Sequence, residues 1–248
     1  MSSSEQLPGS APRKQQALGL FAGLPSGYDR MGALLSFGQD PRWRAALVDT
    51  IDPRPGQRIL DVATGTGLVA VALARRGCEV VGLDQSEQML ARAREKLAAA
   101  PELTKRITFV HGEAERLPFE DGTFDALTFT YLLRYVDDRL ATMAELVRVV
   151  KPGGKIGMVE FGVPRAWPAR PLWRLHTRIS LPAIGRLVSP AWLDVGHFLG
   201  PSIEGLDDAE PDLATLWRRA GVEQVHERRM SFGAGLVMWG VRGDGRPS

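Results

Sequence analysis

The sequence predicts an α/β fold with a doubly wound, mostly parallel sheet of the Rossmann-like type. Three observations support this prediction. Short apolar segments alternate with segments of helical length between residues 58 and 162, a glycine turn from Gly65 to Gly67 follows the first apolar segment, and Asp84 lies at the end of the second. Such alternation gives parallel strands joined by right-handed crossovers. A ligand crevice is therefore expected at the carboxyl ends of the strands.

The elements follow from hydrophobic patterning and from turn residues. The five predicted strands are the apolar runs 58–63, 79–86, 107–114, 124–131 and 155–162. The helices between them are 67–77, closed by Gly77, 86–100, with Ser86 as N-cap, and 137–154, stopped by Pro152 and two glycines. A last helix, 212–221, precedes a C-terminal β-hairpin, 223–243, that turns at Gly233–Gly235.

Outside this core, composition divides the chain into further segments. Residues 1–16 lack the apolar stretch of a signal peptide and are expected to be a disordered tail. Residues 17–51 read as short helices broken at Pro25–Gly27 and Gly38–Pro41, which would form an N-terminal lid. In the last of these helices Trp43, Ala46 and Leu47 share one face. Residues 52–248 are the main domain, with a Pro-, Trp- and Arg-rich helical cap insert at about 164–203.

Composition limits the classes of function. The 248 residues carry a net charge of +2, with 44% hydrophobic and 24% charged residues, as in an ordinary globular protein. A single cysteine, Cys78, excludes an internal disulfide and a metal site built from cysteines. No apolar run is long enough to span a bilayer, so we expect a cytoplasmic location. Nucleic acid is not an expected partner, and no histidine and carboxylate cluster predicts a metal.

The glycine turn fits two kinds of nucleotide ligand. Gly65, Gly67 and Ala70 match a loose dinucleotide fingerprint, and Asp84, which follows Gly65 by 19 positions, is placed to bind ribose hydroxyls. However, Asp61 at the end of the first strand would repel a pyrophosphate and would suit a ligand that carries ammonium and sulfonium charges. A methyl donor is therefore favoured over a nicotinamide dinucleotide, and over a glycine turn that only packs a helix.

At this point the residues resemble a known family. The segments LDVATGTG and VVGLDQS are similar to the first two signatures of class I S-adenosylmethionine-dependent methyltransferases. Four further stretches resemble the ubiquinone/menaquinone biosynthesis C-methyltransferases: YDRMGALLSFGQDPRWR, AERLPFEDGTFDALTFTYLLRYV, ELVRVVKPGGKIGMVEF and FLGPSI. The resemblance implies S-adenosylmethionine as methyl donor, with Asp61 orienting its methionine end, Asp84 on its ribose, and its adenine near Glu113 and Ala114. The residues implicated in the donor site are Asp61, Gly65, Thr66, Gly67, Asp84, Gln85, Met89, Glu113, Ala114 and Thr130.

On the acceptor side the sequence departs from the family pattern. The family's Phe-Gly-x-Arg-Asn is Tyr131-Leu-Leu-Arg134-Tyr135 here, Asn-Ala is replaced by Glu113-Ala114, and Tyr-x-Tyr-Leu is replaced by residues 196–199. The resemblance nevertheless places Arg134 in the reaction chamber, where it could stabilise a phenolate. The other expected substrate contacts are Tyr28, Met31, Tyr131 and Phe198, and the alternative bases are His176 and His197.

We therefore expect C-methylation of a hydrophobic aromatic or quinol, such as a demethylmenaquinol-type acceptor. Methylation of another small metabolite at oxygen or carbon, and a non-catalytic S-adenosylmethionine-binding module, stay open. For Arg134 the alternative is a surface salt bridge to Asp137 or Asp138. Apolar residues beside the arginines of the insert suit peripheral contact with a membrane surface, or else a second small core. A homodimer is compatible with the sequence.

Overall fold

The computed structural model describes residues 19, 36 and 38–244. Tyr28, Met31 and most of the predicted lid and tail lie outside these residues. A sheet of seven strands has the order β3-β2-β1-β4-β5-β7-β6, in which the first five are parallel and β7 is antiparallel to both of its neighbours. The strands are β1 (Arg58–Val62), β2 (Glu79–Asp84), β3 (Ile107–His111), β4 (Phe124–Thr130), β5 (Val150–Phe161), β6 (Val222–Met230) and β7 (Gly235–Arg242).

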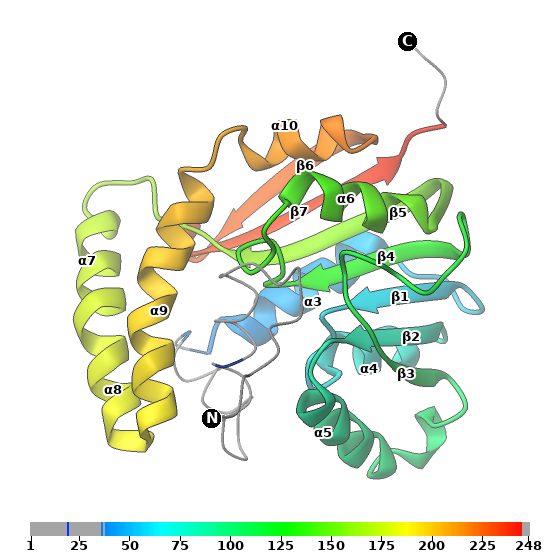
Figure 1. Cartoon of the computed structure of the whole chain (residues 1–248), viewed down its shortest axis with the longest axis horizontal. Helices are drawn as coiled ribbons and strands as arrows, with labels where there is room; N and C mark the ends of the chain where they lie inside the picture. Colours follow the sequence, from blue (N-terminus) through cyan, green and yellow to red (C-terminus); the bar gives the residue numbers. More distant parts are fainter. Residues whose placement is uncertain (1–18, 20–35, 37, 245–248) are drawn as a thin grey trace, which may run out of the picture.

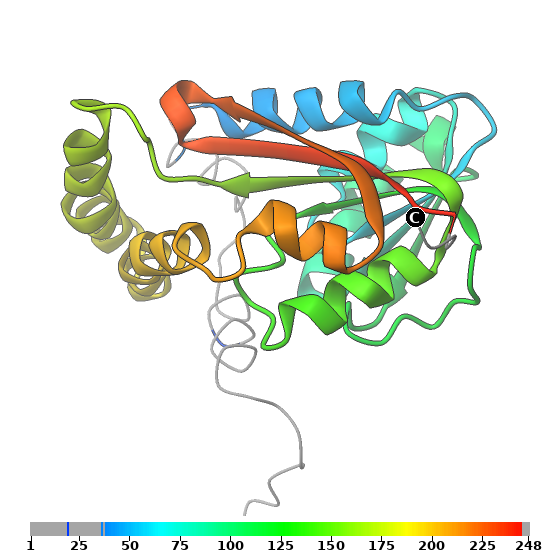
Figure 2. The ribbon, with the colours of Figure 1, turned by 90° about the horizontal axis from the view of Figure 1, so that it is seen from above.

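Helices cover both faces of the sheet, as Figure 2 shows from above. Helices α3 (Asp40–Ile51), α4 (Leu68–Arg75) and α5 (Glu87–Ala98) lie on one face, and α6 (Arg139–Arg148) and α10 (Leu213–Arg219) lie on the other. Each face has its own apolar cluster, one around Trp43, Leu47 and Leu73 and one around Phe129, Leu146 and Trp217. The central strands are thus buried on both sides, which explains their continuous apolar runs.

The segment after β5 is helical and lies at one end of the sheet (Figure 1). It contains α7 (Ala169–Leu175), a π-helical turn η2 (His176–Ser180), α8 (Leu181–Val188) and α9 (Pro190–Asp207). We call these the cap helices. They run four residues beyond the predicted end of the insert, from 203 to Asp207. Leu181, Trp192 and Val195 form a small core with Met89 of α5, so the cap helices are anchored beside the central domain.

Two local predictions need correction. The helix predicted to stop at Pro152 ends at Arg148, and Pro152 with its two glycines belongs to β5, which begins at Val150. The reason is that Val150 already pairs with Phe124 of β4, so the chain joins the sheet two residues before the proline. The other correction concerns Gly38–Pro41, where Gly38 has a left-handed φ of 72° but Pro41 lies in the first turn of α3, a position that proline favours.

The Ser86 and hairpin predictions are confirmed. Ser86 caps α5 by accepting a hydrogen bond from the Met89 amide at 3.3 Å. β6 and β7 form an antiparallel pair with a turn at residues 231–233, close to the predicted glycines. The short apolar strands and the cap residues were local signals, which is why sequence alone could locate them.

Candidate functional site

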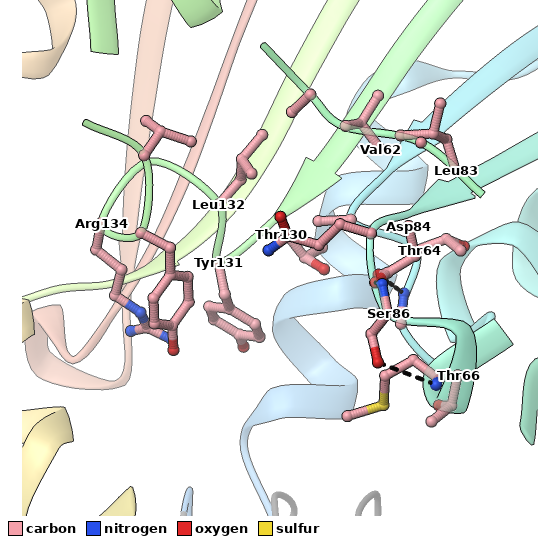
Figure 3. A pocket seen from close by; sticks show the side chains of 18 of the residues that line it. Val62, Thr64, Thr66, Leu83, Asp84, Ser86, Thr130, Tyr131, Leu132 and Arg134 are labelled. Carbon is pink, nitrogen blue, oxygen red and sulfur yellow. Dashed lines mark hydrogen bonds between the residues drawn. The ribbon is translucent and has the colours of Figure 1, made fainter. Parts of the chain in front are cut away.

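The carboxyl ends of β1, β2 and β4 open into one cavity. It encloses about 970 Å³, open solvent at its mouth included. In Figure 3, Asp84, Thr64, Ser86 and Thr66 lie on one side of it and Tyr131 and Arg134 on the other, with Thr130 between them. Nine of the residues singled out from the sequence line it: Gly65, Thr66, Asp84, Gln85, Met89, Ala114, Thr130, Tyr131 and Arg134.

Several other predicted residues lie off this lining. Asp61 is buried behind it, at 1% exposure, and Gly67 and Glu113 flank residues that do line it. Glu115 lines the cavity where Glu113 was expected. His197 is exposed on α9 and His176 lies in η2, and neither is in the lining.

The glycine loop and Asp84 form one hydrogen-bonded unit. The Gly65 amide donates to Asp84 Oδ2 at 2.8 Å and the Ser86 amide to Oδ1 at 2.9 Å. Gly65 and Gly67 have φ values of 57° and 81°, the left-handed region that glycine enters most readily. Burial raises the pKa of Asp84, and the two amides counter this shift. Each carboxylate oxygen can accept a further hydrogen bond, so Asp84 can also accept hydrogen bonds from two vicinal hydroxyls of a ligand.

Asp61 is an anion held beneath the cavity. Its carboxylate accepts hydrogen bonds from Thr64 Oγ1 at 2.6 Å and from Thr128 Oγ1 at 2.7 Å. Burial raises its pKa to about 6, and the two hydroxyls oppose that shift. The group therefore titrates just below neutral pH. Asp61 itself does not line the cavity, but Thr64, which donates a hydrogen bond to it, does. The negative charge of Asp61 would therefore act on a bound ligand from behind Thr64.

We predict from this that binding of a cationic donor depends on pH. A positively charged ligand favours ionised Asp61, so affinity should be full above about pH 7 and should fall as pH drops through 6. If the protonated form binds poorly, affinity at pH 5 should be about tenfold below that at pH 7. Calorimetric titration at several pH values measures this. In Asp61→Asn the dependence should be flat; an unchanged slope in that variant would assign the effect to Asp84 instead.

Arg134 forms a buried ion pair on the far side of the cavity. Arg134 is 5% exposed, and its Nη1 lies 3.1 Å from Oε1 of Glu160 on β5. The alternative of a surface salt bridge to Asp137 or Asp138 is therefore wrong, because the side chain turns inward. Burial alone would lower the pKa of Arg134, but Glu160 and Tyr135 outweigh it and raise the pKa. Arg134 is thus a permanent cation and not a proton acceptor.

Three aromatic rings surround this cation. The Arg134 Cζ lies 5.2 Å from the ring centroid of Tyr131, 4.9 Å from that of Tyr135 and 5.0 Å from that of Phe161. Such contacts stabilise a cation without neutralising it. Among the residues that the structure describes, none accepts a well-aligned hydrogen bond from Nε or Nη1 of Arg134. The guanidinium retains donors for a further acceptor.

Phe198, on α9 of the cap helices, is not in the lining of the cavity but contacts Tyr135, which is. Its ring stacks on Tyr135 at 5.8 Å between centroids and an angle of 11°. Sequence reasoning missed Glu160, Tyr135 and Arg44 as parts of the site. A lone acid inside the apolar strand MVEFG was a usable signal for Glu160, because an ionisable group in a buried strand needs a partner. The contacts of Arg44 and Tyr135 depend on pairing between distant segments and left no local signal.

The class I methyltransferase fold is defined by this order of strands, by the glycine loop and by the acidic residue at the end of β2. Solved structures share it. A putative S-adenosylmethionine-dependent methyltransferase from Methanococcus maripaludis superimposes with a TM-score of 0.61 at 15% identity, covering 98% of this chain and 100% of that one. Phosphoethanolamine N-methyltransferase 2 of Haemonchus contortus, solved with S-adenosylmethionine, gives 0.56 at 17% identity, covering 82% and 53%.

Sequence comparison gives the family. The model of the ubiE/COQ5 methyltransferase family matches residues 11–242. The demethylmenaquinone methyltransferase of Clavibacter sepedonicus is 38% identical over 93% of this chain and 92% of its own length. The C-methyltransferase UbiE of Geobacter sulfurreducens is 36% identical over 90% and 87%. The chain belongs to the ubiE/COQ5 methyltransferase family.

Membership settles the question raised by the glycine turn. The chain is an S-adenosylmethionine-dependent methyltransferase, not a nicotinamide enzyme. Its residues also fit that donor, since the cavity presents the Asp84 carboxylate, with Asp61 behind it as a second anion. A hydroxyl-bearing, positively charged nucleoside needs these two features.

Proposed function

We propose that this enzyme methylates a ring carbon of a demethylmenaquinol-type quinol. One observation carries the proposal: a buried, permanently charged guanidinium in an aromatic cage faces Asp84 across the cavity (Figure 3). The cage suits a flat aromatic acceptor, and the cation suits an acceptor that becomes negatively charged as it reacts.

The roles of the residues follow from this geometry. Asp84 would hold the ribose of the donor, and the apolar side chain of Met89 would face its adenine. When bound, S-adenosylmethionine supplies an electrophilic methyl group. Arg134 would stabilise the phenolate that forms when a ring hydroxyl loses its proton, which makes the neighbouring ring carbon nucleophilic. Glu160 holds Arg134 at 3.1 Å and so fixes its direction.

The proton from the ring hydroxyl would pass to water. After methyl transfer, the hydrogen on the methylated carbon would leave as a proton and the ring oxygen would be protonated again, which restores the aromatic quinol. Burial raises the pKa values of Tyr131 and Tyr135, so both phenols stay neutral and do not abstract a proton at neutral pH. His176 and His197 were the alternative bases, and they lie off the lining of the cavity. A direct histidine base would require the cap helices to move.

Incubation with a short-chain demethylmenaquinol, a reductant and S-adenosylmethionine tests the proposal. Mass spectrometry should show a product heavier by one methyl group, together with S-adenosylhomocysteine in equal amount. The oxidised quinone, which lacks the ring hydroxyl, should not react. Equal turnover of quinone and quinol, or no turnover of either, would contradict the proposed acceptor.

We also propose that the cap helices rest on an anionic membrane surface. Leu172, Leu175 and Ile179 recur every three or four residues through α7 and η2, and Leu187 follows eight residues later in α8. All four are exposed, Leu187 at 87%, and Trp167 before α7 is 85% exposed. Residues 164–193 contain five arginines and no acidic residue. No helix in the described residues could cross a bilayer. An apolar stripe flanked by arginines suits peripheral contact with anionic lipid, where a quinol with an isoprenoid tail resides.

Co-sedimentation with vesicles that contain phosphatidylglycerol measures this contact. The wild-type protein should bind at low salt. Leu172→Glu combined with Leu187→Glu should bind at least about tenfold more weakly, because two large apolar side chains lose their burial in lipid. Leu140→Glu, on α6 and also exposed, is the matched control. Wild-type binding no stronger than that of the double variant would contradict the proposal.

A further inference from the structure

The cavity holds a second arginine besides Arg134. Of the described residues that line the cavity, two are basic, Arg134 and Arg44. Arg134 lies on the acceptor side beside Glu160. Arg44 comes from α3, and its Nη1 donates to Thr130 Oγ1 at 3.2 Å, at the end of β4. Arg44 therefore lies at the junction between the donor and acceptor sides.

The position of Arg44 is fixed by two neighbours. Its Nε donates to both carboxylate oxygens of Asp40, one helical turn earlier, at 3.0 and 2.9 Å. The Tyr131 hydroxyl donates to the same carboxylate, and the Arg44 Cζ lies 5.1 Å from the Tyr131 ring centroid. Tyr131 is itself held, since its ring stacks on Phe161 at 4.6 Å. Arg44 is thus held in place at the lining of the cavity before any ligand arrives.

Sheet order shows which ligand group would meet Arg44. Asp84 ends β2 and Thr130 ends β4, and β1 lies between these strands. Two strand spacings amount to about 10 Å, roughly the reach from a ribose to the end of an amino-acid chain attached to it. A donor with its ribose on Asp84 would therefore bring its amino-acid end to Thr130. That end carries a carboxylate, which a guanidinium fork binds well.

We propose that Arg44 binds the carboxylate of the methyl donor, and that Asp40 and Tyr131 hold it in place to do so. Arg44 would then bind the carboxylate of the donor's zwitterionic end, and the negative charge of Asp61 would stabilise the ammonium group of the same end. The hydroxyl of Tyr131, which stands where the family pattern has a phenylalanine, adds a bond that ties this donor contact to the acceptor-side loop. The inference rests on donor binding and not on the identity of the acceptor.

A ligand pair isolates this interaction. S-adenosylhomocysteine and its decarboxylated analogue share the adenosine, the sulfur and the amine, so calorimetry on both measures what the carboxylate contributes. The wild-type protein should bind S-adenosylhomocysteine about ten- to a hundredfold more tightly. In Arg44→Met the preference should shrink to less than about threefold, with the affinity for the analogue unchanged. Arg42→Met, exposed on the same helix, should keep the full preference.

Other outcomes would overturn the proposal. Equal wild-type affinity for the two ligands would show that no residue binds the carboxylate. An equal loss of affinity for both ligands in Arg44→Met would show that Arg44 only supports the fold. Arg44→Lys and Tyr131→Phe provide the same test if Arg44→Met does not fold. Each should weaken the binding of S-adenosylhomocysteine and leave the binding of the decarboxylated analogue unchanged. No acceptor is present, so failure of the quinol assignment would not affect these results.

Discussion

Arg134→Met is expected to lower kcat by about 100- to 1000-fold, the usual cost of losing one preorganised donor to a developing oxyanion. The KM for S-adenosylmethionine should stay within about threefold of the wild-type value, because Arg134 lies across the cavity from Asp84. Steady-state kinetics with the quinol acceptor measures both constants. A higher KM for the quinol with an unchanged kcat would show that Arg134 only binds the acceptor.

The same replacement should also destabilise the protein, and a second change separates the two effects. Removing Arg134 leaves Glu160, at 1% exposure, without its cation, and breaking such a pair costs about 3–5 kcal/mol of unfolding free energy. Adding Glu160→Gln removes the orphaned charge and should recover most of that stability in urea denaturation. The double variant should remain as slow as Arg134→Met. Recovery of activity together with stability would show that Arg134 acts only through the fold.

Asp84→Ala is expected to weaken donor binding by at least about 100-fold. The carboxylate is the acceptor for the Gly65 and Ser86 amides at 2.8 and 2.9 Å, and it is the expected acceptor for ribose hydroxyls. Its loss therefore removes ligand bonds and releases the glycine loop, and hydrogen bonds to a charged group contribute about 1.5–3 kcal/mol each. Calorimetric titration with S-adenosylmethionine gives the change in Kd.

Asp84→Asn is the matched control for that experiment. Its amide keeps one acceptor oxygen and the size of the side chain but cannot accept both main-chain amides, so binding should fall by about tenfold. Circular dichroism should show both variants folded. Donor affinity of Asp84→Ala within about threefold of wild type would contradict the placement of the ribose.

Local sequence signals predicted the donor half of the site well. The glycine loop, Asp84 and Ser86 belong to short segments in which a strand ends, a turn follows and a helix begins, so their arrangement depends mainly on neighbouring residues. Parallel strands then bring Asp84 and Thr130 to the same edge of the sheet, which the alternating pattern also implied. Local signals misplaced the end of the helix before β5, because pairing of Val150 with Phe124 outweighed the helix-stopping tendency of Pro152.

The acceptor half could be predicted only in part. Resemblance located Arg134, but its inward direction depends on Glu160, 26 positions further along the chain, and on the register that sets Thr130 opposite Val159. The bond between Tyr131 and Asp40 joins residues 91 positions apart. Tyr131 adopts a φ of 57°, which no pattern of apolar residues reveals. These contacts arise from tertiary packing between distant segments, so the sequence alone does not predict them.

The proposed reaction transfers a methyl group to a ring carbon of a quinol. The most direct test uses S-adenosylmethionine with an isotopically labelled methyl group, a reduced demethylmenaquinone as acceptor, and nuclear magnetic resonance of the product. The wild-type enzyme should place the label on a ring carbon of the quinone, at the chemical shift of an aryl methyl group. Arg134→Met should form much less of this product. Label on oxygen, as a methyl ether, would contradict the proposed reaction.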